Sequence, residues 1–244
     1  MGENGAFMLA DMLKKARRTV FFGGAGVSCE SGIPDFRSQD GLYRQKWRYS
    51  PETILSHDFF HRHTGEFYRF YKEKMLFPGA KPNAAHRALA RLEEMGLLSA
   101  VITQNIDGLH QAAGSRKVIE LHGSVHRNFC TACGKSFLLE EIISSSDIPR
   151  CNCGGIIKPD VVLYGEQLPY DAMESALDEI ARADLMIIGG TSLTVYPAAG
   201  FAADFSGKIA IINRSATSMD RRAALLISAP IGETMAAVMQ ALEG

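Results

Sequence analysis

The chain has 244 residues, of which 46% are hydrophobic and 22% are charged, and its formal net charge at pH 7 is −1. This is the composition of a globular protein with one large domain, or with a main domain and a small inserted module. The near-neutral charge argues against nucleic acid or a membrane surface as a partner. The apolar runs are too short to cross a bilayer, and the N-terminal residues do not resemble a secretory signal, so we expect a cytoplasmic protein.

Six short runs rich in Val, Ile and Phe do not alternate with polar residues, which predicts strands buried on both faces of a parallel sheet. In chain order we expect a helix over Phe7–Ala16, a strand over Thr19–Gly23, a helix from its cap Asn83 to Met95, strands over Ala100–Thr103 and Val118–Leu121, a helix over Tyr170–Arg182, a strand over Leu185–Gly189, a helix over Pro197–Phe205, strands over Ile209–Asn213 and Leu225–Ile227, and a helix over Ile231–Leu242. This alternation predicts an α/β fold with a doubly wound parallel sheet.

Two stretches interrupt the alternation. Residues 38–77 are rich in aromatic and basic side chains without a clear strand, and residues 128–155 contain four cysteines. We interpret both as insertions that together form a small lobe, and residues 1–37, 78–127 and 156–244 as the main domain. A cleft between the two lobes is the expected ligand site. The histidines at 57, 61 and 63 lack an acidic partner at metal-ligand spacing, so we expect them on a solvated face.

The cysteines follow the spacing Cys130-x₂-Cys133-x₁₇-Cys151-x-Cys153, and Cys29 stands apart from them. Two pairs on separate turns are typical of a Cys₄ zinc site, and four thiolates leave no open position on the metal. The zinc should therefore be structural. A redox dithiol would not explain the second pair. Cys29 is expected to be a small packed residue near the first glycine cluster.

A glycine cluster follows the first predicted strand, in the run Gly23-Gly24-Ala25-Gly26. Such glycines let the backbone approach a pyrophosphate closely. A plain strand-to-helix turn explains them about as well, and the dinucleotide pattern G-x-G-x-x-G fails because Cys29 occupies its third glycine position. The next motif, Gly32-Ile-Pro-Asp-Phe-Arg37, offers an aromatic ring and a guanidinium, although a surface turn is the simpler interpretation of this motif alone.

Polar residues follow four predicted strands, where ligands bind in open parallel sheets. They are Gln104-Asn105-Ile106-Asp107, His122, Gly190-Thr191-Ser192 and Asn213. His122 is a plausible general base, although a lone histidine is more often structural. The extended run from Lys158 to Glu166 could add a peptide strand, but an ordinary core strand is the more economical interpretation of its sequence.

Taken in order, these motifs resemble the sirtuin family over nearly the whole chain. The resemblance implies a Rossmann-like large domain with an inserted small lobe made of a zinc ribbon and a helical segment. It implies an NAD-dependent protein-lysine deacetylase that releases nicotinamide and O-acetyl-ADP-ribose. The implied partner is an acetyl-lysine protein or peptide, and we expect a monomer.

By match of motif, His122 would be the general base and Asn105 would orient the ribose and a water molecule. The other expected NAD contacts are Gly24, Ala25, Gly26, Ser28, Cys29, Asp35, Phe36, Arg37, Gln104, Ile106, Asp107, Gly190, Thr191, Ser192, Asn213, Arg214 and Ile231. The substrate peptide would face Val162, Tyr164, Gly165, Glu166 and Val195.

The chain departs from the family pattern in several places. Its second cysteine pair is C-x-C where C-x₂-C is usual, and Tyr164 stands where phenylalanine is common. Sirtuins that remove acidic acyl groups carry a Tyr-x-x-Arg pair, and Tyr71 occupies the arginine position here. We therefore expect neutral acyl groups, acetyl above all, although Arg69 and Lys72 flank the position. The segment Ser228–Gly232 replaces a loop richer in glycine and acidic residues.

Three other functions compete with this interpretation. A mono-ADP-ribosyltransferase would cleave NAD in the same way and use another acceptor. A Rossmann dehydrogenase is disfavoured by the failed G-x-G-x-x-G pattern. A zinc-ribbon binding module without catalysis would not explain the motifs outside the ribbon, and the near-neutral charge argues against a nucleic-acid ligand for it.

Overall fold

The structure is a computed structural model, and it describes residues 2–36, 41 and 47–244. Six parallel strands form the large sheet, in the order β3-β2-β1-β7-β8-β9. Their bounds are β1 Thr19–Gly23, β2 Ala100–Thr103, β3 Val118–Glu120, β7 Leu185–Gly189, β8 Lys208–Ile212 and β9 Leu225–Ile227. The six predicted strands are confirmed, with β3 one residue shorter and β8 shifted by one residue.

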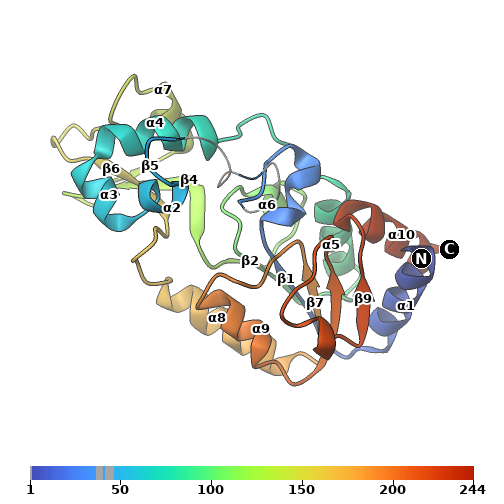
Figure 1. The fold of residues 1–244 in the computed structure, drawn as a ribbon. Coiled ribbons are helices and arrows are strands. Elements are labelled where there is room, and N and C mark those ends of the chain that lie inside the picture. Colours follow the sequence, from blue (N-terminus) through green and yellow to red (C-terminus); the bar gives the residue numbers. More distant parts are fainter. Residues whose placement is uncertain (1, 37–40, 42–46) are drawn as a thin grey trace.

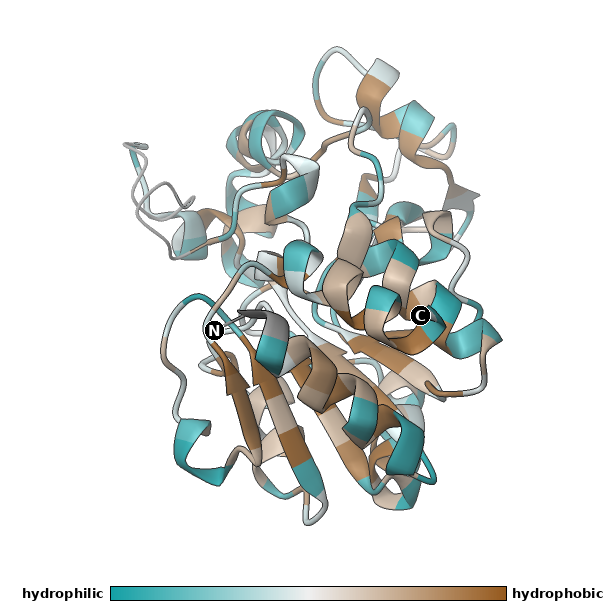
Figure 2. Cartoon of the chain, turned by 90° about the vertical axis from the view of Figure 1, so that its right-hand side faces the viewer, coloured by the Kyte–Doolittle hydropathy of each residue, from teal (hydrophilic) through white to brown (hydrophobic). Residues whose placement is uncertain are grey.

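Helices cover both faces of this sheet, so the predicted doubly wound architecture is confirmed (Figure 1). One face packs against α1 Gly2–Lys15, α5 Ala84–Glu94 and α10 Ile231–Glu243. The other packs against α8 Tyr170–Arg182 and α9 Ala198–Ala203. The short α6 Leu109–Ala112 follows β2. Figure 2 shows the hydrophobic colour concentrated on the strands, while the helices carry hydrophilic patches. This is the pattern expected of strands buried on both faces.

The chain reverses its direction of travel across the sheet between β1 and β7. From β1 the strand order runs through β2 to β3 on one side and through β7 and β8 to β9 on the other. In open parallel sheets this switch point leaves a crevice at the carboxyl ends of the strands. The loops that follow β1, β2 and β7 therefore meet at one place.

A smaller unit lies beside the large sheet. It contains α2 Pro51–Ile54, α3 His57–Arg62, α4 Thr64–Lys74 and α7 Leu139–Ser144, with an antiparallel sheet ordered β5-β4-β6. These strands are β4 Gly123–Cys130, β5 Ser136–Phe137 and β6 Ile157–Val161. The small sheet thus extends on both sides of residues 128–155. The division of the chain into domains stays a prediction.

Aromatic side chains form the core of this small lobe. Phe60, Phe67 and Phe70 are fully buried there together with Tyr68 and Tyr71. The rings of Phe60 and Phe67 meet edge to face with their centroids 4.9 Å apart. This geometry contributes beyond simple area burial. The aromatic richness of the insert is therefore explained by its separate core.

Asn83 connects two parts of the main domain. Its side-chain oxygen accepts the Ala85 N–H at 2.9 Å and so caps α5, as predicted. Its side-chain nitrogen donates to the Val27 carbonyl at 2.7 Å and to Ser31 Oγ at 3.0 Å. One buried amide thus ties the start of α5 to the loop after β1.

We expect Asn83→Ala to lower the free energy of unfolding by about 2 kcal/mol, because it removes both a helix cap and a buried donor. Asn83→Ser keeps a side-chain oxygen that can cap the helix and loses the donor, so its stability should lie between those of the alanine variant and the wild type. Urea unfolding of the three proteins measures this order. A loss below about 0.5 kcal/mol for the alanine variant would show that the amide does not tie these segments together.

Candidate active site

A cleft of about 520 Å³ opens at the switch point, between the large sheet and the small lobe. Most of the residues expected to contact NAD line it: Ala25, Gly26, Ser28, Asp35, Phe36, Gln104, Asn105, Ile106, Asp107, His122, Gly190, Thr191, Ser192 and Asn213. The residues expected to face a peptide line it too: Val162, Tyr164, Gly165, Glu166 and Val195. The structure therefore brings both predicted groups to one cavity.

Four predicted NAD contacts do not line this cleft, and one lies outside the described residues. Gly24, Cys29 and Arg214 are near it but are not part of its wall. Ile231 does not line the cleft and packs in the core on one face of the sheet with only 4% of its surface exposed, so its contact with NAD stays a prediction. Its sequence position after β9 gave no indication that the side chain turns inward. Arg37 lies outside the described residues.

The glycines after β1 allow two loops to touch. The Gly26 N–H donates to the Gly190 carbonyl at 2.8 Å, and a Cβ at Gly26 would lie 2.8 Å from the Gly190 backbone. A Cβ at Gly24 would lie 2.9 Å from Thr191 Cβ. Gly24 is thus required where the loop after β1 packs against Thr191, although it does not line the cleft itself. The backbone around Gly26 remains the part that can approach a phosphate.

Ser28 joins two polar residues of the loop after β2. Its hydroxyl lies 2.6 Å from Asp107 Oδ2, and Asn105 Nδ2 donates to Ser28 Oγ at 3.0 Å. Asp107 Oδ1 also accepts the Leu109 N–H at 2.9 Å. The hydroxyl must donate to the carboxylate, because the carboxylate can only accept. These bonds hold Asn105 and Asp107 in fixed orientations at one wall of the cleft.

His122 is set to accept a proton. Its Nδ1 lies 3.0 Å from the Gln104 carbonyl oxygen, and since that oxygen can only accept, Nδ1 carries the hydrogen. Nε2 is then left with its lone pair. Burial lowers the pKa of His122 and outweighs the opposing effect of the Gln104 carbonyl, so the ring stays neutral at neutral pH. A neutral imidazole with a free acceptor nitrogen can act as a general base.

Gly123 fixes the turn that carries His122. It has a φ of +75°, and a Cβ there would lie only 1.9 Å from the Asp160 carbonyl oxygen. No other residue can occupy this position without moving β6. This glycine follows His122 directly in the sequence. Its main role is to let β4 and β6 approach each other next to the histidine.

Glu166 anchors the segment that ends in Tyr164-Gly165. Its carboxylate accepts the Leu163 N–H at 2.9 Å and the buried Lys158 Nζ at 3.1 Å, and its other oxygen lies 3.0 Å from His57 Nδ1. Burial raises the pKa of Glu166, but these three partners lower it more, so the carboxylate is favoured. The strand itself ends at Val161. The segment after it is therefore a rigid loop of the small lobe.

Several residues that line the cleft were not predicted from the sequence. The small lobe contributes Leu55, Met75, Phe77 and Leu139, and β4 contributes His126. None belongs to a recognisable motif. Tyr71, whose position was linked to the acyl group, is fully buried in the small-lobe core, and neither it nor Tyr68 lines the cleft. The histidines at 57, 61 and 63 are exposed, as expected.

The four clustered cysteines meet in one place. Their sulfur atoms all lie within 4.8 Å of one another, which makes this the candidate metal group among the described residues. Cys130 and Cys153 sulfurs are 3.4 Å apart, and those of Cys133 and Cys151 are 3.7 Å apart. Four thiolates suit a structural zinc ion, as the sequence predicts.

We expect Cys151→Ser to remove the bound zinc and to destabilise the small lobe, because three thiolates bind zinc less tightly and the β4–β6 ribbon depends on the site. Metal analysis should give about one zinc for the wild-type protein and much less for the variant. Cys29→Ser is the matched control and should retain the metal. An unchanged zinc content in Cys151→Ser would contradict the four-cysteine assignment.

Two buried histidines lie behind the wall that contains Asp107. The rings of His86 and His110 are 4.7 Å apart, and neither nitrogen of His110 has a hydrogen-bond partner within the described part of the chain. Burial lowers the pKa of both rings below the ordinary value of 6.5. Both histidines are therefore neutral in the folded protein, while the unfolded chain binds protons at each as the pH falls below that value.

Stability should consequently fall as the pH drops below about 6.5, since the unfolded state then binds more protons. Each histidine contributes at most about 1.4 kcal/mol per pH unit. His110→Leu removes one of these groups and should reduce the slope by about that amount, with little loss of stability at pH 8. Denaturant unfolding between pH 5 and 8 measures the slopes. Equal slopes for the two proteins would show that His110 is charged or solvated in the fold.

The fold and cleft define an α/β protein with a nucleotide-type crevice, and comparisons with known proteins identify its family. Residues 24–197 match the model of the Sir2 family. The NAD-dependent protein deacetylase of Clostridium acetobutylicum is 56% identical over 236 residues, which cover 95% of this chain and 96% of that protein. The corresponding protein of Thermotoga maritima is 47% identical over 239 residues, which cover 94% of this chain and 95% of that protein. The chain therefore belongs to the Sir2 family.

Solved structures agree with this assignment. A Sir2 complex with a deacetylated p53 peptide and 3'-O-acetyl-ADP-ribose has a TM-score of 0.89 at 45% identity, covering 96% of both chains. A Sir2 complex with a p53 peptide and NAD⁺ has a TM-score of 0.85 at 46% identity, again covering 96% of both chains. Within the described residues, no helix is long and apolar enough to cross a membrane.

Proposed function

We propose that the protein is an NAD-dependent protein-lysine deacetylase that releases nicotinamide and O-acetyl-ADP-ribose. One observation carries the proposal: a single cleft joins the glycine loop of a parallel sheet, a neutral histidine with a free acceptor nitrogen and the rigid segment around Gly165. The similar proteins are named for this activity, and the similar structures contain NAD⁺, acetyl-ADP-ribose and peptide. This arrangement supports a cleft that takes both substrates of the proposed reaction.

The large domain would hold NAD. The lack of side chains around Gly26 would let the phosphates approach the backbone closely, and Phe36 and Asp35 line the same cavity. Thr191, Ser192 and Asn213 line the same cavity. Asn105, held by Ser28, would orient the ribose and a water molecule. Ile106 and Asp107 would enclose the nicotinamide ring and keep water from it.

His122 would move the proton. Breaking the bond between nicotinamide and ribose leaves an electron-poor ribose carbon, which the acetyl oxygen of the substrate attacks. His122 Nε2 then accepts a proton from a ribose hydroxyl, and that oxygen attacks the former acetyl carbon. Water completes the release of the lysine amine. The Nδ1–H bond to Gln104 keeps the ring in the tautomer that can accept this proton.

The small lobe would hold the acetylated lysine. The cleft is lined by Val162, Tyr164-Gly165-Glu166 and Val195, which would face the peptide. The bonds of Glu166 to Lys158 and His57 keep the segment around Gly165 rigid. Zinc at the four cysteines would hold the ribbon and take no part in the chemistry, because its coordination is complete.

Three further features belong to this proposal. The acyl group would be neutral, since Tyr71 stands at the position of the family's arginine, even though this buried side chain does not line the cleft and the cation Lys74 does. The protein would act as a monomer on protein substrates, without nucleic acid or membrane. Four metal-binding thiolates favour a reducing compartment, which supports the cytoplasm as its location.

We expect NAD⁺-dependent loss of acetyl from an acetyl-lysine peptide, with O-acetyl-ADP-ribose formed in equal amount. His122→Ala should lower kcat/KM by at least about 100-fold, because it removes the general base. His63→Ala, an exposed histidine outside the cleft, is the matched control. Mass spectrometry measures both products. A succinyl-lysine peptide assayed in parallel gives the kcat/KM against which that of the acetyl-lysine peptide is compared.

Three results would count against parts of the proposal. Equal kcat/KM on the succinyl and acetyl peptides would remove the preference for neutral acyl groups. Full activity of His122→Ala with unchanged zinc content would remove the histidine as base. Label from NAD⁺ bound covalently to protein, without deacetylation, would replace the proposed reaction by ADP-ribosyl transfer.

A further inference from the structure

An irregular stretch of β4 lies directly after the His122 turn. Ser124 pairs with Asp160 of β6, and Asn128 pairs with the next residue, Pro159. Three residues of β4 thus lie between two pairs whose residues in β6 are adjacent in the sequence. Bulges of this kind redirect side chains and are common beside active sites. Here the bulge comprises Val125, His126 and Arg127.

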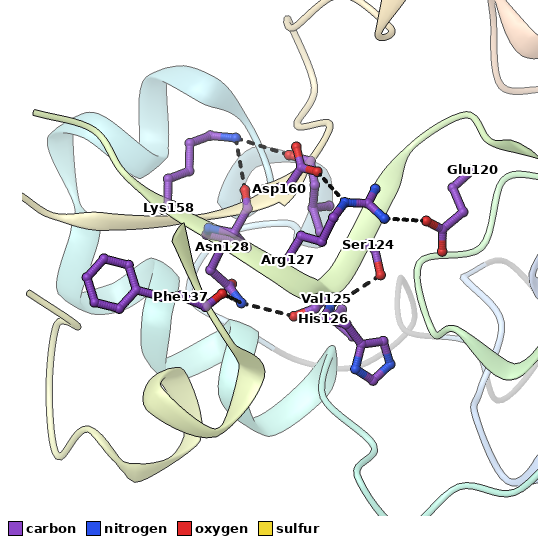
Figure 3. A network of polar contacts seen from close by, with 11 residues as sticks. Glu120, Ser124, Val125, His126, Arg127, Asn128, Phe137, Lys158 and Asp160 are labelled. Carbon is purple, nitrogen blue, oxygen red and sulfur yellow. Dashed lines mark hydrogen bonds and ion pairs between the residues drawn. The ribbon is translucent and has the colours of Figure 1, made fainter. Parts of the chain in front are cut away.

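The bulge points its two polar side chains to opposite sides of β4 (Figure 3). On one side, Arg127 donates to Glu120 at 2.7 Å and to Asp160 at 2.8 Å. The Asn128 side chain donates to the Val125 carbonyl at 3.2 Å. These contacts join β3, β4 and β6, so the bulge has one defined conformation.

On the other side, His126 reaches the loop after β2. Its Nε2 lies 3.1 Å from the Asp107 carbonyl oxygen. Because that oxygen can only accept, Nε2 carries a hydrogen and donates it. The neighbouring backbone supports the contact, since the Val125 N–H donates to the Ile106 carbonyl at 3.0 Å. His126 also lines the cleft.

Gly108 makes this contact possible. It has a φ of +72°, and a Cβ there would lie 2.7 Å from the His126 ring. The imidazole therefore packs directly on the Gly108 backbone. Asp107 is then held at three points: its carboxylate by Ser28 and by the Leu109 N–H, and its carbonyl by His126.

We propose that His126 is a positioning residue that fixes the peptide group between Asp107 and Gly108 and thereby sets the affinity of the cleft for nicotinamide, both as part of NAD⁺ and as the free product. The inference rests on the proposed function, in which Ile106 and Asp107 enclose the nicotinamide ring. His126 acts through these residues by holding their backbone. Its role is thus distinct from that of His122, which faces the reacting atoms.

Three substitutions separate the hydrogen bond from simple packing. His126→Ala removes both, His126→Phe keeps a ring without the donor, and His126→Gln keeps an N–H donor at nearly the same distance from the backbone. We expect the alanine and phenylalanine variants to raise the KM for NAD⁺ and the inhibition constant of nicotinamide by about threefold to tenfold, the effect of losing one hydrogen bond. The kcat should change little, and the glutamine variant should recover most of the loss.

The backbone can be followed without any enzyme assay. Amide hydrogen exchange at Leu109, whose N–H donates to Asp107, should be faster in the alanine and phenylalanine variants and near wild type in the glutamine variant. His63→Ala is the matched control and should change neither exchange nor KM. Zinc content and thermal unfolding show that each variant is folded.

The outcomes distinguish the inference from the proposed function. Wild-type values of KM, nicotinamide inhibition and exchange in His126→Phe would overturn the inference, because the donor would then be irrelevant. A glutamine variant as impaired as the alanine variant, with both folded, would overturn it as well. Failure of the wild-type protein to deacetylate any peptide, with the expected exchange pattern intact, would remove the proposed function and leave the backbone role of His126 supported.

Discussion

The cleft depends on a backbone contact between the loops that follow β1 and β7. The Gly26 N–H donates to the Gly190 carbonyl at 2.8 Å, and a Cβ at Gly190 would lie 2.4 Å from the Val27 nitrogen. A side chain at either position would separate the loops. Because the strand order reverses between β1 and β7, the two loops meet at the base of the crevice. The crevice opens toward the small lobe.

A second close contact attaches the small lobe at the reacting end. Gly123 brings β4 against Asp160 of β6, and the chain enters β4 directly from His122. The Val162 N–H also donates to the His122 carbonyl at 3.0 Å. The histidine backbone therefore sits between the large sheet and the peptide-facing segment. Any shift of the small lobe would move His122 together with that segment, which keeps the two proposed substrates in register.

Backbone carbonyl oxygens around the cleft fix the proton positions of two histidine rings. Carbonyl oxygens, which can only accept, receive hydrogens from His122 Nδ1 and from His126 Nε2, and this decides the tautomer of each ring. Ser28 in turn donates to Asp107 and accepts from Asn105. The proton positions that the proposed chemistry needs thus follow from backbone geometry, and burial keeps His122 neutral.

The sequence by itself determined the features that depend on local chemistry. Buried strands show as unbroken apolar runs, cysteine pairs show metal binding through their spacing, and glycines mark places where the backbone must pass closely. Contacts between distant segments were decided only by the tertiary structure. Ile231 follows a strand as Asn213 does, yet it turns into the core, and His126 enters the cleft because a bulge in β4 redirects it. Leu55 and Leu139 look like ordinary core residues, and they line the cleft because two insertions far apart in the chain pack together there. The side to which such a residue points depends on its packing partners, and sequence spacing does not encode them.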